Sequence, residues 1–536
     1  MHLAVVFSFF LMFFKTFEMS VIKHVYYKNR ATDNQVYESV ILAPRGSIYD
    51  RKGRVLAESL YHYFKDIDGK VVYEGTDIYS GLKFEEQGVS YELRRKYPYG
   101  NALAFVSGYV AKPKEEEIAN AGCKKHLDKR SLVGRSGIES WFDCFLRGED
   151  GNRLVEVDAK GKFVRDLGRE EPKPGASLVL SIDAFWQKKA YDLLAGRKGA
   201  LIASDPKTGK ILAFVSSPAY DPNDFSYQAD QQKIMDYLQD EYYLPLLNRV
   251  SSAKFHPGSV FKMVVATAGL EEKTVTANTA FADTGSIKVG EYEYRNWLWT
   301  KRGQVDGQVD MYKGLQRSND VYFYKLGETL GPDKIKKWAQ IYGYNAKTGI
   351  EIGGETEGLI PDPAWKEKVK KEKWFLGNTY HMSIGQGDVD VSPLQVQVAT
   401  TAIANDGTWC RPSLVADNNP DCKKMPVSYD TIKVLQEGMS RACATGGTAW
   451  PLFNFKTKIA CKTGTAQVGD GSPDLHAWLT AFAPIVDPQI AITVMMERAG
   501  EGSDEAAPIV GDFLKAWFEE TDTVVPRKTD VKVVGE

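Results

Sequence analysis

A serine followed three residues later by a lysine can supply a nucleophile and its activating base. The chain contains at least five Ser-x-x-Lys tetrads, but only Ser259-Val-Phe-Lys262 both follows Pro-Gly and opens a long apolar-periodic segment without proline. In a helix this spacing puts both side chains on one face, with the hydroxyl at the helix N-terminus. Many such tetrads are simple helix caps, so burial and nearby positive charge would have to lower the pKa of the lysine. The context selects Ser259 as nucleophile and Lys262 as base.

Two further motifs could complete a site around this pair. Lys-Thr-Gly occurs three times: at Lys207 and Lys347 in turn-like surroundings, and as Lys462-Thr463-Gly464-Thr465 at the end of an alternating, strand-like segment. A strand edge can pair with an extended peptide while a lysine and hydroxyl groups bind its carboxylate. Ser318-Asn319-Asp320 precedes an aromatic run, and its serine could relay a proton to a leaving amine. The same tripeptide is also common in caps and turns.

The surrounding patterns predict the elements that would hold these residues. Period and length indicate helices near 186–194, 259–271, 311–329, 333–342, 393–406 and 511–518, and strands near 177–183, 199–205, 211–216, 456–462, 477–483 and 489–496. The economical arrangement is one sheet assembled from both ends of this region around a mostly helical insert. We therefore expect an α/β fold of the α+β kind.

The N-terminal part of the chain has a different pattern. The apolar run Leu3–Phe14 is twelve residues long, whereas a spanning helix needs roughly twenty. No basic residue precedes the run and no cleavage-site pattern follows it, so an uncleaved membrane anchor that lacks its first residues fits best. Lys15–Tyr37 indicates a juxtamembrane helix or stalk. The segment 59–93 is short-patterned, polar and irregular, and Ala102–Val110 is strand-like.

Composition limits the other classes of function. The chain has 536 residues, enough for two to four domains, and 68 Lys and Arg balance 70 Asp and Glu, which gives no reason to expect nucleic acid as a partner. Seven scattered histidines lack helical ligand spacing and the six cysteines form no C-x-x-C, so we expect neither a metal nor a cofactor.

The cysteines leave alternatives open. Cys410 and Cys422 lie twelve residues apart in a polar segment, which is typical of a small surface disulfide loop but does not require one. The pair Cys123 and Cys144 is a weaker disulfide candidate. Buried free thiols are the simpler expectation for Cys443 and Cys461.

The three motifs together resemble those of a known family. Ser259-x-x-Lys262, Ser318-x-Asp320 and Lys462-Thr463-Gly464, in that order and separated by 59 and then 144 residues, resemble the motifs of penicillin-binding proteins and serine β-lactamases. The likeness to class B high-molecular-weight transpeptidases runs almost end to end. Segments similar to that class are 45–53, 95–100, 134–139, 146–148, 205–213, 248–249, 383–387 and 476–478; of the subtypes, 97–100 and 157–161 look closer to the elongation-type penicillin-binding protein 2.

The resemblance implies a domain division and a set of residue roles. It implies an anchor and juxtamembrane helix over 1–28, an elongated α+β pedestal over 29–174, a transpeptidase domain with an antiparallel sheet and an all-helical subdomain over 175–525, and a tail over 526–536. The implied reaction is acyl transfer on D-Ala-D-Ala stem peptides. Implied roles are attack by Ser259 with Lys262 as base, proton delivery by Ser318 beside the acceptor Asp320, carboxylate binding by Lys462 and Thr463, and an oxyanion hole from the backbone N–H groups of Ser259 and Thr465.

The resemblance also implies partners and a location. These are stem peptides as donor and amine acceptor, β-lactams, a SEDS-family glycosyltransferase with the elongation machinery, and the cytoplasmic membrane, crossed once with the catalytic domain outside. The sequence departs from many relatives at Asp320, where Asn is frequent, at Cys461, where Gly is frequent, and in a short interval between Asp50 and Tyr97 that suggests a reduced pedestal head. A D,D-carboxypeptidase or β-lactamase, or a non-catalytic β-lactam sensor, are the competing hypotheses.

Overall fold

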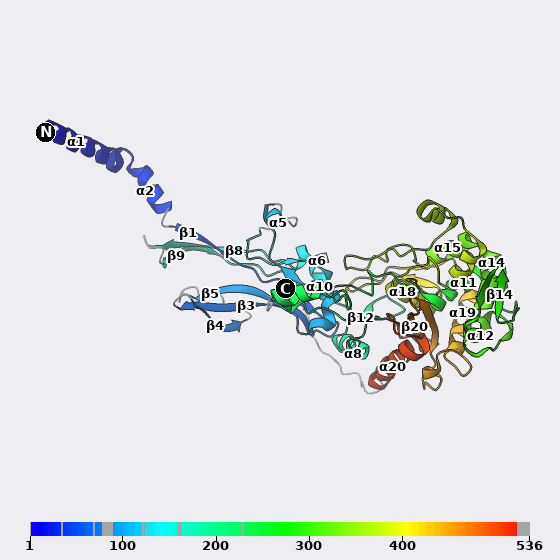
Figure 1. Ribbon diagram of the computed structural model, residues 1–536. Coiled ribbons are helices and arrows are strands. Elements are labelled where there is room, and N and C mark those ends of the chain that lie inside the picture. Colours follow the sequence, from blue (N-terminus) through cyan, green and yellow to red (C-terminus); the bar gives the residue numbers. More distant parts are fainter. Residues whose placement is uncertain are drawn as a thin grey trace.

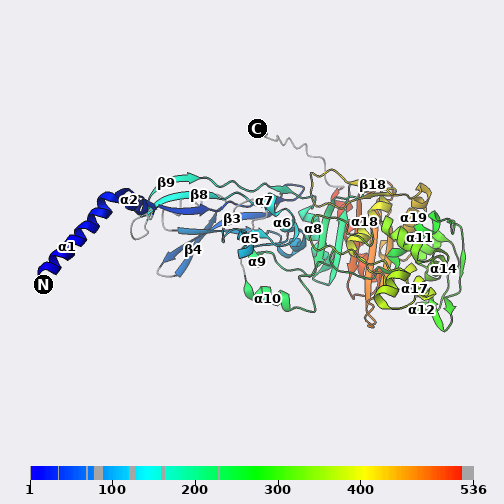
Figure 2. The same cartoon turned by 90° about the horizontal axis from the view of Figure 1, so that it is seen from above.

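The computed structural model describes residues 2–521 apart from 34–35, 68–69, 78–88, 120–122, 124–126, 158–162 and 227–229. The expected tail at 526–536 and most of the segment 157–161 therefore lie outside the described residues. The chain is elongated: the N-terminal helices form one end, narrow sheets follow, and the larger α/β domain forms the other end (Figure 1, Figure 2).

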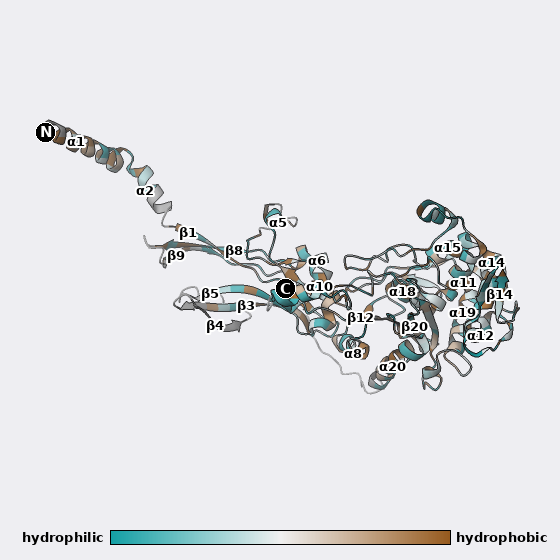
Figure 3. Cartoon of the chain, viewed as in Figure 1, coloured by the Kyte–Doolittle hydropathy of each residue, from teal (hydrophilic) through white to brown (hydrophobic). Residues whose placement is uncertain are grey.

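The N-terminus forms one long helical segment. Helix α1 (His2–Phe17) continues through a π-helical turn (Glu18–Ile22), and α2 (His24–Asp33) follows. The window Val5–Ile22 is long and apolar enough to cross a membrane, judged by length and composition, and it is the one such helix in the described part of the chain. Figure 3 shows hydrophobic residues along α1, and their side chains are exposed.

This helix is longer than the apolar run suggests. The run ends at Phe14, but the hydroxyls of Thr16 and Ser20 donate to the carbonyls one turn earlier, at 2.8 and 2.6 Å. A hydroxyl that donates a hydrogen bond to its own helix backbone is not left unsatisfied in an apolar environment. The described helix therefore extends beyond the twelve-residue apolar run and reaches spanning length over Val5–Ile22.

Two narrow sheets make up the region between the helices and the α/β domain. The segment 59–93, expected to be irregular, contains long antiparallel strands, so that expectation is wrong. Their core is aromatic rather than aliphatic, with Tyr61, Tyr63, Tyr91 and Leu93 buried against Leu42, which explains the missing aliphatic alternation. The strands are β1 (Val36–Ile41), β8 (Gly151–Val157) and β9 (Phe163–Glu170) in one sheet, and β2 (Ile48–Tyr49), β3 (Val55–Ile67), β4 (Lys70–Asp77), β5 (Val89–Lys96) and β10 (Leu178–Val179) in the other.

Short helices and a buried ion cluster connect this region to the next. The strand expected at Ala102–Val110 is wrong, because Gly100–Leu103 is a 3-10 turn and α4 (Ala104–Ser107) follows it; a short buried apolar run does not distinguish the two structures. The fully buried Glu139 carboxylate pairs with both Arg45 (2.8 Å) and Arg95 (2.6 Å). The remaining elements here are α5 (Glu115–Ala119), α6 (Gly137–Trp141), α7 (Asp143–Leu146), β6 (Val110–Ala111) and β7 (Val133–Gly134).

A five-stranded antiparallel sheet organises the α/β domain, in the order β12-β11-β21-β20-β19. Alternate residues of β11 face opposite layers: Leu201 packs with α8 and α20, whereas Ile202 packs in the core of the helical insert. The predicted sheet built from both ends of the region is confirmed. The elements are α8 (Ala184–Leu194), β11 (Gly199–Ser204), β12 (Ile211–Ser217), β19 (Ala460–Gln467), β20 (Leu475–Ala483), β21 (Ile490–Met496) and α20 (Ala507–Thr521).

The insert is mostly helical, as predicted, but one helix is divided. The segment expected to form a single helix over 311–329 breaks at Ser318, whose φ of 54° is left-handed, and Asn319 caps the second half. The apolar period continues across the break, which is why the sequence does not reveal it. The longer helices are α10 (Gln231–Gln239), α11 (Lys262–Glu271), α13 (Met311–Arg317), α14 (Asp320–Leu330), α15 (Pro332–Ile341), α17 (Leu376–Ser383), α18 (Pro393–Ala404) and α19 (Tyr429–Ala442).

Shorter elements complete the insert. In the described part of the insert, β13 pairs with β16, β14 with β15 and β17 with β18, each as a two-stranded sheet. Their bounds, with those of the short helices, are α9 (Asn223–Ser226), β13 (Phe281–Asp283), β14 (Ser286–Val289), β15 (Tyr292–Arg295), α12 (Trp297–Arg302), β16 (Gly307–Val309), α16 (Pro363–Trp365), β17 (Thr408–Cys410) and β18 (Cys422–Lys424).

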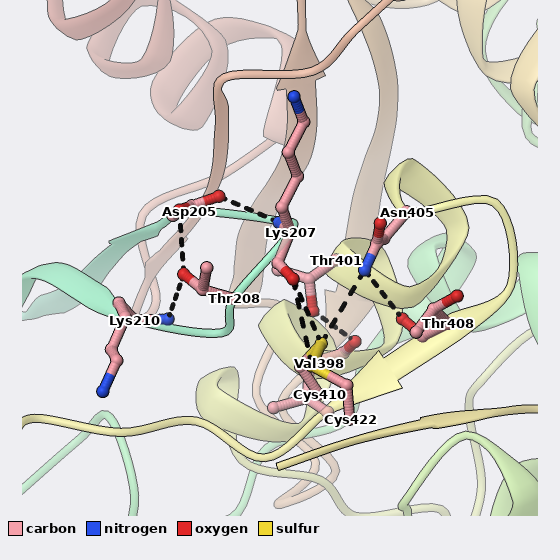
Figure 4. Close-up of a disulfide and its surroundings, with 10 residues drawn as sticks. All are labelled: Asp205, Lys207, Thr208, Lys210, Val398, Thr401, Asn405, Thr408, Cys410 and Cys422. Carbon is pink, nitrogen blue, oxygen red and sulfur yellow. Dashed lines mark hydrogen bonds between the residues drawn. A yellow bond between two sulfur atoms is a disulfide. The ribbon is translucent and has the colours of Figure 1, made fainter. Parts of the chain in front are cut away.

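All six cysteines are paired. Cys410–Cys422 closes the β17–β18 hairpin, and Cys410 Sγ lies 3.5 Å from the carbonyl oxygen of Lys207, in the Lys-Thr-Gly turn between β11 and β12 (Figure 4). Cys123–Cys144 forms the second disulfide. The expectation of free thiols at Cys443 and Cys461 is wrong: they form the third, because α19 packs on β19 and brings their Cα atoms to 5.7 Å.

Candidate active site

Ser259 faces a cleft of about 950 Å³ between the helical insert and β19. It lies in a 3-10 turn (Gly258–Phe261) directly before α11, and buried Val260 and Phe261 fix that turn in the core. Gly258 has a φ of 56°, and a Cβ on it would lie 2.7 Å from the carbonyl oxygen of Thr465. The Pro-Gly that singled out this tetrad is therefore a requirement for bringing Ser259 against β19.

A second glycine supports the turn from the other side. Gly258 N donates to Gly385 O at 2.9 Å, and a Cβ on Gly385 would lie 2.3 Å from Gly258 O. Gln386 Nε2 reaches the carbonyl of Thr465 at 3.5 Å. The segment 383–387, noted in the sequence, thus packs beneath both Ser259 and β19.

Lys262 joins the first motif to the second. Its Nζ donates to Ser318 O at 2.8 Å, to Ser318 Oγ at 3.4 Å and to Asp320 Oδ1 at 2.6 Å. The side chain is fully buried, and its ammonium group lies 5.4 Å from the centroid of the Phe323 ring. Burial lowers the pKa of Lys262, and the Asp320 carboxylate opposes this in part.

Lys462 joins the third motif to the second. Its Nζ donates to Ser318 Oγ at 2.8 Å, and the side chain is fully buried. Burial lowers the pKa of Lys462 well below its ordinary value, and the positive charge of Lys262 lowers it further. Asp320 is hydrogen-bonded to Lys262 alone, and its charge acts on Lys462 from farther away, so the two buried lysines together favour release of a proton. Ser318 Oγ bridges the two lysines.

The strand β19 presents the remaining predicted residues. Thr463 Oγ1 and Thr448 Oγ1 are 2.6 Å apart, and Thr465 Oγ1 accepts from Gly502 N at 3.3 Å. A Cβ on Gly464 would lie 3.0 Å from Pro257 O, so glycine allows the turn that bears Ser259 to contact the strand. Thr463 and Thr465 line the cleft together with Ser259, Ser318 and Asp320.

All eight predicted site residues thus belong to one cluster of elements. The direct hydrogen bond between Ser259 and Lys262 is not formed. Among the described residues, Ser259 Oγ has no hydrogen-bond partner, and Lys262 is bonded to Ser318 and Asp320 instead. Such contacts often tighten only when substrate binds. In the described part of the chain no group of three or more His, Cys, Asp or Glu side chains is placed to hold a metal ion.

Comparison with known families decides the classification. The family model of the penicillin binding protein transpeptidase domain matches residues 199–515, more than half of the chain, and that of the penicillin-binding protein dimerisation domain matches 69–180. The chain belongs to the penicillin-binding protein transpeptidase family. The peptidoglycan D,D-transpeptidase MrdA of Acinetobacter baumannii is 34% identical to it, over 80% of this chain and 67% of that protein.

Solved structures of similar proteins agree. This penicillin-binding protein superposes on PBP2 of Helicobacter pylori, solved in complex with MreC, with a TM-score of 0.78 and 29% identity over 91% of this chain and 99% of that one. A chain of a peptidoglycan synthase complex, solved in a study of how polymerization and crosslinking are coordinated, gives 0.78 and 27% over 99% of both chains.

Several cleft residues of this penicillin-binding protein are not predicted from the sequence. Trp297 N donates to Asp320 Oδ2 at 2.9 Å, Trp297 Nε1 donates to Arg317 O at 2.9 Å, and Thr448 contacts Thr463. An ion pair between Lys301 and Glu501 joins the insert to the sheet side of the cleft. Trp297, Thr448, Lys301 and Glu501 do not lie in a motif whose spacing indicates chemistry, so only the fold reveals them.

Proposed function

We propose that this protein is a peptidoglycan D,D-transpeptidase that cross-links stem peptides in cell-wall elongation through an acyl-enzyme on Ser259. The observation that carries the assignment is the convergence of the buried Lys262 and Lys462 on the Ser318 hydroxyl, which lines the same cleft as Ser259. A serine hydroxyl between two lysines of lowered pKa can pass a proton in either direction. Membership of the transpeptidase family, and the D,D-transpeptidase named MrdA as a relative, support the same reaction.

The first half of the reaction forms an ester. Ser259 Oγ attacks the penultimate D-Ala carbonyl of the donor, and its proton passes to neutral Lys262. The backbone N–H groups of Ser259 and Thr465 donate to the oxyanion as the carbonyl becomes tetrahedral. The C–N bond then breaks, and the proton passes through Ser318 to the nitrogen of the departing D-Ala.

Lys462 and Thr463 bind the terminal carboxylate of the donor. An arriving carboxylate stabilises the charged form of Lys462, and a charged Lys462 in turn favours neutral Lys262. Donor binding therefore prepares the base that the first step needs. In the second half an amine of a neighbouring stem peptide attacks the Ser259 ester, its proton leaves through the same residues, and the cross-link forms while Ser259 is restored.

The remaining assignments are proposals of the same kind. We assign 1–28 as membrane anchor and juxtamembrane helix, 29–174 as pedestal and 175–525 as transpeptidase domain. We also propose a single pass through the cytoplasmic membrane with the catalytic domain outside, and the spanning-length helix at 5–22 supports the pass itself. The similar H. pylori PBP2, solved with MreC, and the similar chain of a synthase complex support elongation machinery and a SEDS-family glycosyltransferase as partners. β-Lactams, as acylating analogues of the donor, would react with Ser259.

Labelling with a fluorescent penicillin tests the proposal. The full-length protein in detergent should form a stable adduct, and Ser259→Ala should form none. The matched control is Ser251→Ala, which alters the preceding Ser-x-x-Lys tetrad at a buried serine whose hydroxyl has no hydrogen-bond partner among the described residues. An unlabelled wild-type protein, or labelling that survives Ser259→Ala, would refute the assignment.

Turnover of the adduct separates the competing enzymes. A long-lived adduct together with cross-linked product from disaccharide-peptide substrate supports transpeptidation. Rapid loss of the label would indicate a β-lactamase, and release of D-Ala without cross-links would indicate a D,D-carboxypeptidase. A stable adduct with neither cross-link nor D-Ala release would indicate a sensor.

A further inference from the structure

The second motif has a backbone that must be held in place. Ser318 adopts a left-handed φ of 54° at the break between α13 and α14, although it is not glycine. Its carbonyl and hydroxyl, with the Asp320 carboxylate, make all the hydrogen bonds that fix Lys262 Nζ. A non-glycine residue keeps such a conformation only when its surroundings determine it.

A buried polar network lies directly behind this break. Its centre is the carboxylate of Asp283 at the end of β13, which is 3% exposed. Asp283 Oδ2 accepts from Asn296 Nδ2 at 2.8 Å, from Asn319 Nδ2 at 2.8 Å and from Asp306 N at 2.9 Å. Asp283 Oδ1 accepts from Gly285 N at 2.8 Å. Four donors thus converge on one carboxylate.

Each asparagine of the network also holds the motif. Asn319 Oδ1 accepts from Tyr322 N at 2.9 Å and so caps α14, while its Nδ2 also donates to Asp306 Oδ2 at 3.0 Å. Asn296 Oδ1 accepts from Asp320 N at 3.2 Å. Asp283 is therefore one residue removed from the backbone of Asp320 and Tyr322, which follow Ser318 in the chain, although it does not line the cleft.

We propose that Asp283 is a positioning residue for the reaction, which acts through Asn296 and Asn319 to set the Ser318 hydroxyl and the Asp320 carboxylate against Lys262 and Lys462. The inference rests on the proposed function, because positioning has meaning only if those four groups take part in the reaction. An acceptor-only carboxylate suits the task, since it turns both asparagine amides so that their oxygens face the motif. Neutral side chains of similar size cannot accept all four hydrogen bonds.

Asp283→Asn is the informative variant. The amide keeps the shape but turns one acceptor into a donor, so at least one of the four hydrogen bonds is lost. A small displacement of catalytic groups lowers rates by up to about 100-fold. We expect the acylation rate constant with fluorescent penicillin to fall roughly 10- to 100-fold, while the concentration for half-maximal rate changes little.

The pH dependence separates positioning from loss of fold. The charged groups that face Lys262 are Asp320 from α14 and Lys462 from β19, and the Arg317–Asp306 pair lies behind the motif. If Asp320 moves away from Lys262, the acid limb of acylation shifts to lower pH. A purely structural role would lower the labelled fraction and the melting temperature, but neither the rate constant per labelled site nor the position of that limb.

Asp310→Ala is the matched control. It removes the cap of α13, where Asp310 Oδ1 accepts from Lys313 N at 2.8 Å, without touching the network. This variant should lose stability and keep the wild-type acylation rate constant. If Asp283→Asn does not fold, Asn296→Ala is the substitute variant. It removes the link to Asp320 N and keeps the link through Asn319. It should show the same loss of acylation rate and the same shift of the acid limb.

The outcomes are distinct. A wild-type rate constant and unchanged pH dependence in Asp283→Asn, or a loss confined to the labelled fraction, would overturn the inference and leave the proposed function intact. Absence of labelling in the wild-type protein would remove the proposed function itself.

Discussion

Gly258→Ala tests whether contact between the turn that bears Ser259 and strand β19 sets the activity. The new Cβ would lie 2.7 Å from Thr465 O, closer than such atoms approach, and 3.1 Å from Thr465 C, which is also a tight contact; both are backbone atoms that cannot rotate away. A left-handed φ on alanine costs roughly 1–2 kcal/mol, and overpacking at a close contact adds roughly 1–3 kcal/mol. The expected loss of unfolding free energy is roughly 2–5 kcal/mol.

The functional loss should be larger than the loss of stability suggests. The overlap separates Ser259 from Thr465, and both backbone N–H groups are proposed to bind the same oxyanion. A shift of this kind costs up to about 100-fold in rate. The assay is the second-order rate constant for labelling by fluorescent penicillin, measured below the melting transition, with chemical denaturation for stability.

Gly196→Ala provides the comparison. Gly196 has a φ of 72°, and a Cβ added to it would have no heavy atom outside the neighbouring residues within 4 Å. It carries the conformational cost of roughly 1–2 kcal/mol without the overlap, so it should lose some stability and acylate at the wild-type rate. Wild-type acylation by Gly258→Ala, or an equal loss in Gly196→Ala, would refute the reasoning.

Three further predictions follow from other parts of the chain. Replacing Cys443 and Cys461 with alanine opens a disulfide of sequence separation 18 and should cost about 3 kcal/mol of unfolding free energy by urea titration; equal stability with and without the disulfide would contradict its presence. Asp320→Asn removes the charge that raises the pKa of Lys262, so the base is neutral at lower pH and the acid limb of the acylation profile should move to lower pH, not higher. Glu139→Gln leaves two buried arginines without their shared charge and should cost roughly 3–5 kcal/mol by denaturation, whereas labelling of the native protein should persist.

The sequence is most informative where local period and tertiary environment agree. Helix α18 is predictable because its Ser392 cap, Pro393 and continuous apolar residues all favour a buried helix. The break at Ser318 is not, because apolar spacing continues across it, and the Asn319 side chain that caps α14 is held by Asp283, which lies 36 residues earlier in the chain. The strands over 59–93 escape prediction because tyrosines, not aliphatic residues, form their core.

The residues of the site also fall into those that the sequence predicts and those that it does not. The residues of the three motifs can be selected from type, spacing and context, and the fold brings them together. The supporting residues cannot: Asn296 and Trp297 lie far from the motifs in sequence and reach Asp320 only because β15 leads into α12 beside α14. The pairing of Cys443 with Cys461 cannot be predicted for a comparable reason, since neither local sequence indicates that α19 packs on β19.

The strand order β12-β11-β21-β20-β19 has a consequence for synthesis of the protein. The central strand, β21, is formed by residues 490–496, and β11 on one side and β20 on the other both pair with it. A nascent chain that has emerged only as far as Lys462 contains the first two motifs. It does not yet contain the central strand that joins the two halves of the sheet. Ser259 and Lys462 can meet only after nearly the whole chain has been made, so a ribosome-released fragment cannot carry out acyl transfer, and its unpaired strand edges would be substrates for chaperones or proteases.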